Sequence, residues 1–427
     1  MKIDRKTFVR SLGLGALGAM AGRPHARAGS PVPEALPPFD PGAPQEFWRR
    51  VRALYPLADD PLYLNTGGLG PTPQPVLDAF FATMRQLQEH SETGHGLFAP
   101  ARETVARFLG AQPEEICFTR NATEANSIIA AGLALQPGDE VIFDSHAHPG
   151  GSFPWLNQAK QRGVVIRLFE PDVESAEGNL SRIRDLITPR TRVIQVSHVT
   201  CTHGLLFPGR EIARLARERG IWSHFDGAQA VGMIPVSMAE LGGDSYAISG
   251  HKWLGGPHET GVLYLRRSRL EDVASTGIGA YSGELPRLPG ELAYHPAASR
   301  HEYGTRNAAA VVGLAEAVRL QEAIGPDRIA AYGRELATSL MEGLAGVDGI
   351  ETLTPRDAAL RGAIVTVRHA RANASKFFGY LMEQHGLRCR PVTEQGLEAV
   401  RISLHVFNSP ADCARVIAAV RAAARAL

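Results

Sequence analysis

Residues 221–230 read Ile-Trp-Ser-His-Phe-Asp226-Gly-Ala-Gln229-Ala, and residues 245–253 read Ser-Tyr-Ala-Ile-Ser249-Gly-His251-Lys252-Trp. Each stretch begins with an apolar run of the length typical of a buried strand and ends in polar side chains. Alone, Asp226 could be a helix cap and Lys252 a surface charge. Together, an acid at the end of one parallel strand and a lysine just past another point into the crevice where open α/β sheets bind ligands. The pattern predicts an α/β fold with both residues in one site.

Similar apolar runs alternate with helical patterns from about residue 60 onwards. The predicted buried strands are Ile116–Thr119, Glu140–Phe143, Val164–Leu168, Arg192–Val196, Ile221–Phe225, Ser245–Ile248 and Gly261–Leu265, with helices at Thr123–Leu135, Gly209–Arg219 and Pro235–Leu241. This alternation predicts βαβ units in a mostly parallel seven-stranded sheet covered by helices on both faces. After Arg306 a helix at Ala308–Ala323 precedes strands at Ala363–Val367 and Val400–Leu404 and helices at Ser375–His385 and Pro410–Ala426, which predicts a small α+β domain.

The amino terminus has the order of an export signal. Basic residues up to Arg10 precede the apolar run Ser11 to Ala21 and the small-x-small site Ala26-Arg-Ala28. Asp4-Arg-Lys-Thr-Phe-Val-Arg10 resembles the twin-arginine (Tat) motif, with Lys6 where the second arginine usually stands. We therefore expect a cleaved signal at 1–28, Tat export and a periplasmic protein, with a disordered basic tail as the alternative. The apolar run is too short for a permanent membrane anchor.

Composition excludes several classes of protein. The chain has 427 residues, of which 44% are hydrophobic and 21% charged, so it can bury large cores and is not disordered. Without residues 1–28, which hold six basic side chains and one acidic one, the formal charge of +1 becomes −4. That balance predicts no nucleic-acid partner. Four cysteines form no disulfide framework, no metal site is predicted, and no strand is followed by a G-x-G-x-x-G turn.

Asp226-Gly-Ala-Gln229, followed about twenty residues later by Ser249-Gly-His251-Lys252, resembles the class V aminotransferase family of pyridoxal-phosphate (PLP) enzymes of fold type I. The resemblance runs from Tyr63 to the end of the chain, and the family's branches include cysteine desulfurases and isopenicillin-N epimerase-like proteins. It implies a large PLP-binding domain at 63–306 and a small domain at 307–427, which an extended segment at 29–62 joins.

The resemblance also implies roles around the cofactor. Lys252 would form the Schiff base and carry the substrate α-proton, a task that requires a lowered pKa. Asp226 would pair with the pyridine nitrogen and Gln229 with the phenolate oxygen. The remaining cofactor ligands would be Ala122, Thr123, Ser249 and His251 at the phosphate, with His148 stacked on the ring and Thr305 reaching the phosphate of the neighbouring subunit in a homodimer. As alternatives, Asn121 or Thr123 could be an ordinary N-cap, His148 a capping or surface residue, and His146 the stacking group.

Two further residues would bind the substrate. Arg401 resembles the arginine that holds the α-carboxylate, because a planar guanidinium meets a carboxylate with two hydrogen bonds. Without the resemblance, Arg401 is predicted to be an edge-strand charge. Asn65, in Tyr63-Leu-Asn65-Thr-Gly-Gly68, lies in the segment that borders the substrate pocket. The partner is therefore a small amino-acid-type molecule.

The cysteines help to decide whether the chain resembles the desulfurase branch or the epimerase-like branch of the family. Desulfurases need a mobile cysteine thiolate, and Cys389 lies in the right region but in a stretch, Leu387–Val392, that predicts a strand edge with a buried thiol. Cys117 and Cys413 are predicted to be structural, and Cys201 stands where desulfurases usually carry asparagine. The run from His251 to Pro257 and the His148-Pro-Gly-Gly segment resemble the epimerase-like branch, which includes an exported siderophore-tailoring enzyme. We expect a transaminase or epimerase acting at an α-carbon, with a cysteine desulfurase or C–S lyase, or a non-catalytic binding module, as alternatives.

Overall fold

Seven strands pair into one sheet in a computed structural model that describes residues 36–284 and 287–427; the predicted export signal lies outside the described residues. The strands are β2 (Ile116–Thr119), β3 (Glu140–Asp144), β4 (Val165–Phe169), β5 (Thr191–Ser197), β6 (Trp222–Asp226), β7 (Ser245–Ser249) and β8 (Gly261–Leu265). Their order is β2-β8-β7-β6-β5-β3-β4, and β8 is antiparallel to both its neighbours while the other pairs are parallel. The predicted mostly parallel seven-stranded sheet is confirmed.

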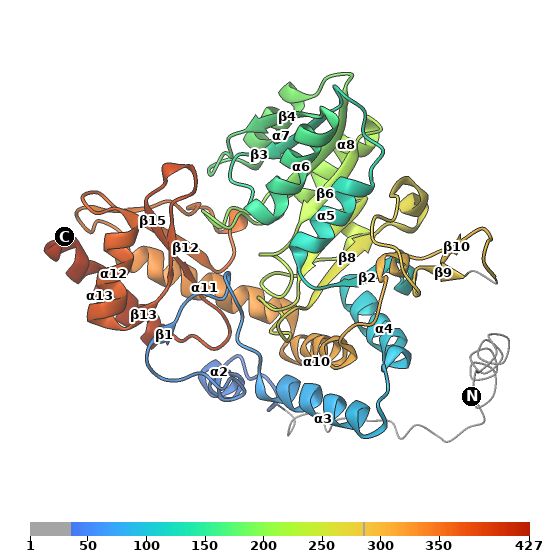
Figure 1. Cartoon of the computed structure of the whole chain (residues 1–427). Helices are drawn as coiled ribbons and strands as arrows, with labels where there is room; N and C mark the ends of the chain where they lie inside the picture. The colour runs from blue at the N-terminus through green and yellow to red at the C-terminus, as the bar shows by residue number, and fades with distance from the viewer. Residues whose placement is uncertain (1–35, 285–286) are drawn as a thin grey trace, which may run out of the picture. The chain divides into compact units, whose positions relative to one another are not determined.

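Helices cover both faces of this sheet because its strands are apolar on both sides (Figure 1). One face packs against α5 (Ala122–Gly132) and α6 (Pro149–Arg162). The other packs against α4 (Phe98–Leu109), α7 (Ala176–Leu186), α8 (Gly209–Glu218) and the first part of α10 (Ala308–Ile324), with α3 (Gln74–His90) beside them. The carboxyl ends of β6 and β7 bring Asp226 and Lys252 to the same edge of the sheet, as parallel pairing requires.

Two local predictions are wrong. The strand predicted at Val164–Leu168 is not buried: β4 pairs on one side only, and Val165 and Leu168 are 39% and 53% exposed. An apolar run alone does not tell a central strand from an edge strand. The helix predicted at Pro235–Leu241 is only α9 (Met238–Leu241), because Ser237 caps it by accepting from the Glu240 N–H.

A second, four-stranded antiparallel sheet forms the carboxyl-terminal part. Its order is β11 (Ile350–Thr352), β12 (Ile364–His369), β15 (Ala399–Ser403) and β14 (Arg390–Val392). Three helices, α11 (Pro326–Leu344), α12 (Ala374–His385) and α13 (Pro410–Ala426), accompany it. The remaining strands are short: β1 (Leu62–Tyr63) pairs with β13 (Leu387–Arg388), and β9 (Gly283–Glu284) pairs with β10 (Ala293–Tyr294). Arg401 lies on β15 between two neighbours, so the prediction of an edge-strand charge is wrong.

An extended segment was predicted before Leu62, and this prediction is wrong in part, because Pro44–Ala53 is helix α2. Its apolar side Phe47, Trp48 and Val51 is buried in the core of the four-stranded sheet, and the Trp48 ring stacks on Tyr332 of α11 at 4.0 Å. Burial of this apolar side stabilises the helix. The proline-rich sequence around it had instead favoured the prediction of an extended segment. The domain boundary at residue 306 stays a prediction. No helix in the described part of the chain is both long and apolar enough to cross a membrane.

Candidate active site

Asp226 ends β6 and is almost buried, at 6% exposure. Its Oδ1 accepts from the Ala228 N–H at 3.0 Å, and its Oδ2 accepts from the Asn126 side-chain amide at 3.0 Å. These two N–H donors hold the Asp226 carboxyl group in place at the carboxyl end of the sheet.

A chain of hydrogen bonds continues behind Asn126. Trp222 Nε1 donates to Ser245 Oγ at 2.9 Å, Ser245 Oγ lies 2.8 Å from His224 Nδ1, and His224 Nε2 lies 2.8 Å from Asn126 Oδ1. Since an amide oxygen only accepts, His224 Nε2 carries the proton, and its Nδ1 accepts from the serine hydroxyl. Every donor therefore points towards Asp226. Burial lowers the pKa of His224 to about 4, which keeps the ring neutral in this arrangement.

Neither Asn126 nor His224 was predicted from the sequence to belong to the site. A signal was present for each: His224 is a histidine between Trp222 and Phe225 in a strand predicted to be buried, and Asn126 lies on the buried side of α5 with Ala122, Ala125 and Ile129. Their contact joins residues 98 positions apart, so only the fold shows that β6 and α5 bring them together.

Lys252 follows β7 in a tight turn that several contacts hold. The backbone N–H of Gly70 donates to His251 O at 2.8 Å, and Trp253 O accepts from both Gln321 and His405 at 2.9 Å. Any side chain at Gly70 would collide with the Lys252 carbonyl. Burial lowers the pKa of Lys252; the Arg401 guanidinium lowers it further, while Asp226 opposes the shift. The amine is therefore closer to the neutral, reactive form than an exposed lysine.

The predicted anion site lies at the start of α5. The Ala122 N–H points to Ser249 Oγ at 3.3 Å, which brings together two residues predicted to bind phosphate. Asn121 does cap the helix, accepting from the Glu124 N–H, and this local role leaves the Ala122 and Thr123 positions at the helix start for an anion. His251 Nδ1 lies 3.0 Å from Thr260 O, so Nδ1 carries its proton and Nε2 is the remaining polar atom.

His148 caps α6 by accepting the Gly150 N–H at 3.0 Å through Nδ1, and its ring is exposed. Part of the ring is nevertheless covered by protein, and this desolvation together with the nearby Lys252 lowers the pKa of His148. The alternative stacking residue, His146, is 2% exposed, and its Nε2 lies 2.9 Å from Glu170 Oε1. Its buried ring is therefore less accessible to a ligand than the ring of His148. A neutral, exposed ring beside Lys252 and Asp226 is available to stack on a flat ligand.

Arg401 is the most deeply buried cation of the site, at 1% exposure. Its Nη1 donates to Cys201 O and its Nη2 to Asn65 Oδ1, both at 2.9 Å. Its Nε has no partner among residues 36–284 and 287–427, and no carboxylate of those residues pairs with it. Burial lowers the pKa of Arg401 to about 10. A buried guanidinium that meets only neutral oxygens is a site for an incoming anion.

Gln229 is held at both ends of its side chain. Its Nε2 donates to Gly67 O at 2.8 Å, and its Oε1 accepts from Trp253 Nε1 at 2.8 Å. One N–H of the amide remains for a ligand such as the predicted phenolate oxygen. A Cβ at Gly67 would lie 2.8 Å from Gln229 Oε1 and 3.1 Å from Arg401 Cζ, so only glycine fits between these two side chains.

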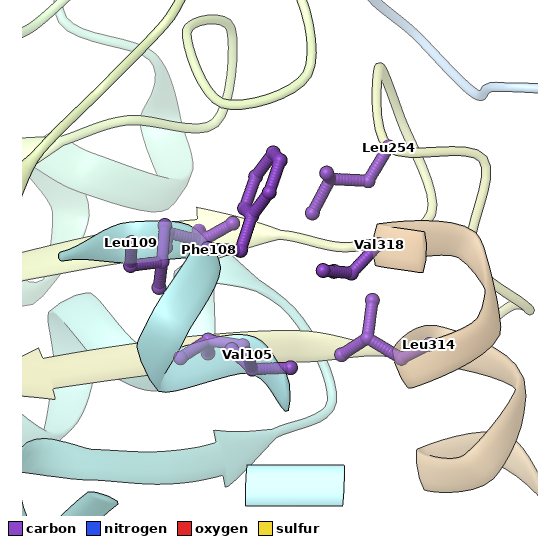
Figure 2. Close-up of a pocket in the computed structure, with 8 residues that line it drawn as sticks. Val105, Phe108, Leu109, Leu254, Leu314 and Val318 are labelled. Atoms are coloured by element: carbon purple, nitrogen blue, oxygen red, sulfur yellow. The ribbon is translucent and has the colours of Figure 1, made fainter. Parts of the chain in front are cut away.

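Two other cavities are not this site. Figure 2 shows the first, a gap between α4 and α10 that only hydrocarbon side chains line, among them Val105, Phe108 and Leu314. It offers no polar atom to a substrate. The second, of about 270 Å³, is polar and is lined by Thr119, Arg120 and the exposed Thr305. Thr305 thus lies near the strand that leads to the anion site, and neither Lys252 nor Asp226 lines that cavity.

The residues present fit PLP. Glycine borders the space on two sides: a Cβ at Gly151 would lie 2.8 Å from Asp226 Oδ2, and one at Gly150 would collide with Thr123 Oγ1. An anion site at a helix start, a fixed carboxylate, a lysine with a lowered pKa and an exposed imidazole match the phosphate, pyridine nitrogen, aldehyde and ring face of that cofactor. The described residues contain no group of three or more side chains placed to hold a metal ion.

Comparison with known proteins agrees with this geometry. Residues 63–416 match the aminotransferase class-V family, to which the chain belongs. It is 34% identical to a probable cysteine desulfurase of Pseudomonas aeruginosa over 84% of this chain and 92% of that protein. It is 29% identical to the isopenicillin N epimerase of Amycolatopsis lactamdurans over 88% and 98%. The apo structure of a cysteine desulfurase from Thermococcus onnurineus NA1 has a TM-score of 0.80 at 26% identity, covering 89% of this chain and 98% of that one.

The fold is therefore fold type I, and the protein is a PLP-dependent enzyme of the class V type. This result argues against a non-catalytic binding module. The relatives include both desulfurases and epimerases, so membership of the family leaves the reaction open.

All four cysteines lie in the described part of the chain and are buried, at 4% exposure or less. Burial raises the pKa of Cys389 to about 12, and its thiol contacts the Leu387 carbonyl. Burial also raises the pKa of the Cys201 thiol, although its backbone carbonyl touches Arg401. No described cysteine is an exposed, readily ionised thiol of the kind that accepts sulfur.

Proposed function

We propose that the protein acts at the α-carbon of an amino acid, or of an amino-acid-derived substituent, as a transaminase or epimerase. The observation that carries the proposal is Arg401, a buried guanidinium bonded only to neutral oxygens. An unpaired buried charge is costly, and a substrate carboxylate would compensate it with a planar, two-point contact. Arg401 would therefore orient the α-carbon with respect to Lys252.

Lys252 would move the α-proton. Burial lowers the pKa of Lys252, which favours the neutral amine that a proton acceptor requires. PLP, when bound, supplies an electron sink for the charge that remains at the α-carbon. Asp226, held in place by Asn126, would keep the cofactor nitrogen protonated, and His148 would exclude water from one ring face.

Deuterium incorporation tests this proposal independently of the final product. Holoenzyme is incubated in D2O with a panel of amino acids and a glutamate-containing siderophore precursor, and the α-position is followed by NMR. We expect exchange with at least one substrate, its loss in Lys252→Ala, and a weaker apparent affinity in Arg401→Gln. Exchange that persists in Lys252→Ala, or its absence for the whole panel, would refute the proposal.

A C–S lyase is the second candidate. It is favoured by relatives named cysteine desulfurase, and elimination of sulfur from the β-carbon starts from the same α-proton removal. The buried cysteines argue against sulfur transfer to the protein itself. Cysteine or cystine would then release sulfur into solution without a protein persulfide. Mass spectrometry of the protein after turnover separates this reaction from a desulfurase, in which a cysteine would gain one sulfur atom.

We also propose export. The support is the order of basic, apolar and small residues over 1–28. The first 28 residues fused to a reporter protein should direct it to the periplasm through the Tat route, and replacement of Arg5 should abolish that transport. A reporter that stays in the cytoplasm would refute the proposal.

A homodimer with shared sites is likewise a proposal. The support is that Thr305 is exposed and that the cavity it lines contains neither Lys252 nor Asp226 of its own chain, so the side chain is available to a second subunit. Thr305→Ala should weaken PLP binding, and a mixture of Thr305→Ala and Lys252→Ala subunits should recover part of the activity in mixed dimers. A monomer with full PLP affinity would refute it.

A further inference from the structure

Two arginines face each other in the substrate side of the site. Arg390 on β14 is the register partner of Arg401 on the adjacent antiparallel strand β15. Directly opposed residues of an antiparallel pair project from the same face with their Cβ atoms about 5 Å apart. Like charges in that position repel. A single substrate carboxylate at Arg401 would leave the charge of Arg390 without a counter-charge, so another group must compensate it.

Glu394 supplies a counter-charge to Arg390 from the turn that follows β14. The two form an ion pair through Arg390 Nη2 and Glu394 Oε1. Their side chains are 27% and 24% exposed, respectively, so the pair is partly open to solvent and does not belong to the core. The pair is neutral overall and leaves Arg401 as the uncompensated charge for a carboxylate.

Each member of this pair keeps one buried atom without a partner among the described residues. These atoms are Arg390 Nη1, a donor, and Glu394 Oε2, an acceptor. Buried polar atoms are nearly always hydrogen-bonded in native proteins, and exceptions call for an explanation. An unpaired donor beside an unpaired acceptor, on the strand next to Arg401, is complementary to a group that carries one acceptor and one donor.

The position of Glu394 is fixed by its turn. Gln395 adopts a left-handed backbone conformation with φ of 53°, next to Gly396 with φ of 68°. The Gln395 side-chain amide donates to Ser145 O at 2.7 Å, in the loop that leads to His148. The turn therefore bridges the four-stranded sheet and the seven-stranded sheet, and a strained residue is retained there at a cost.

We propose that Arg390 and Glu394 form a second substrate subsite, which binds a side chain bearing an acceptor and a donor on neighbouring atoms, such as a carboxamide. This inference rests on the proposed function, since it assumes that Arg401 holds the α-carboxylate of the same molecule. An alkyl side chain of the same size would leave both atoms unpaired and desolvated. We expect discrimination of roughly 10- to 100-fold against the alkyl analogue.

Near-isosteric amino acids test the subsite in the wild-type holoenzyme. L-asparagine is compared with L-leucine, and L-glutamine with L-methionine, by titrating the visible absorbance of the bound cofactor. The expected result is tighter binding of each amide than of its alkyl partner. Leucine binding as tightly as asparagine, and methionine as tightly as glutamine, would overturn the subsite and leave the proposed function intact. No spectral change and no α-exchange with any amino acid would overturn both.

Variants locate the effect. Arg390→Met and Glu394→Leu should each bring the ratio of amide affinity to alkyl affinity close to one, whatever their effect on the affinity for leucine itself. Glu394→Gln, which keeps an acceptor oxygen, should retain part of the preference. The control is Glu351→Leu, which breaks the exposed Arg368–Glu351 pair on the same sheet and should leave the preference unchanged. A preference that survives in both Arg390→Met and Glu394→Leu would place the recognition elsewhere and refute the assignment.

Discussion

Replacement of Asn126 by aspartate tests whether Asp226 is fixed in the way the structure shows. Asn126 Nδ2 donates to Asp226 Oδ2 at 3.0 Å, and its Oδ1 accepts from His224. Asn126→Asp keeps the shape and the acceptor for His224 but puts a second carboxylate oxygen against Asp226. Both positions are buried, so water screens the repulsion little.

The size of that repulsion decides the outcome. Two unit charges 3.0 Å apart repel by about 5.5 kcal/mol at an effective dielectric constant of roughly 20. Protonating one carboxyl of ordinary acidity at pH 7 costs about 4 kcal/mol. Since repulsion exceeds that cost, the folded variant takes up one proton that the unfolded chain releases. Its free energy of unfolding, relative to wild type, should therefore fall by about 1.4 kcal/mol per pH unit from about pH 5 upwards, and the slope should level off at about pH 8, where protonation costs as much as the repulsion.

Urea unfolding of the cofactor-free protein at about pH 6, 7 and 8 measures this slope. Ser127→Asp is the matched control, because it adds the same charge to the next residue of α5, where the side chain is exposed. We expect a difference from wild type that grows with pH for Asn126→Asp and stays constant for Ser127→Asp. Equal, pH-independent differences for the two variants would refute the proximity of Asn126 and Asp226.

Three shorter predictions follow from other contacts. Burial raises the pKa of Asp144 to about 6, so its contribution to stability is lost as the pH rises from about 4 through that value; Asp144→Asn should raise the melting temperature more at about pH 8 than at about pH 5. Gly151→Ala puts a Cβ 2.8 Å from Asp226 Oδ2 and should weaken PLP binding to the cofactor-free protein at least tenfold, roughly the cost of one strained contact. The control is Gly96→Ala, whose Cβ meets nothing within 4 Å and which should leave PLP binding unchanged. Cys389→Ser should leave turnover of cysteine per PLP-loaded subunit within about twofold of wild type, because its buried thiol is not a nucleophile; a loss of sulfur release would restore the desulfurase interpretation.

The large sheet could be predicted from the sequence because its physical signal is local. Strands buried on both faces are runs of apolar residues, and all seven lie within one residue of their predicted ends. The exposure of β4 could not be predicted, because it depends on whether another strand pairs with its outer edge. Helix α2 could not be predicted for a similar reason: it is stabilised by packing of Trp48 on Tyr332, which is remote in the sequence.

The same distinction holds for the site. Asp226 and Lys252 could be predicted because they end strands that run to the same edge of the sheet. Asn126, His224 and Glu394 could not, because their importance lies in contacts between elements that the chain brings together only when folded. A polar residue on an apolar face is the one local signal that pointed to the first two.

The two sheets divide the work of the site, and this division explains how relatives with different names share one fold. In the proposed site, the seven-stranded sheet supplies Asp226, Lys252 and the anion site, which would hold the cofactor whatever the substrate. The four-stranded sheet supplies Arg401 and its register partner Arg390, which we propose bind the substrate. A change on β14 or in the turn at Glu394 can therefore alter the substrate without disturbing the bonds that fix Asp226. On this reasoning, substitutions at Arg390 and Glu394 should change which amino acid reacts, whereas substitutions at Asn126 should change the reaction of every substrate alike.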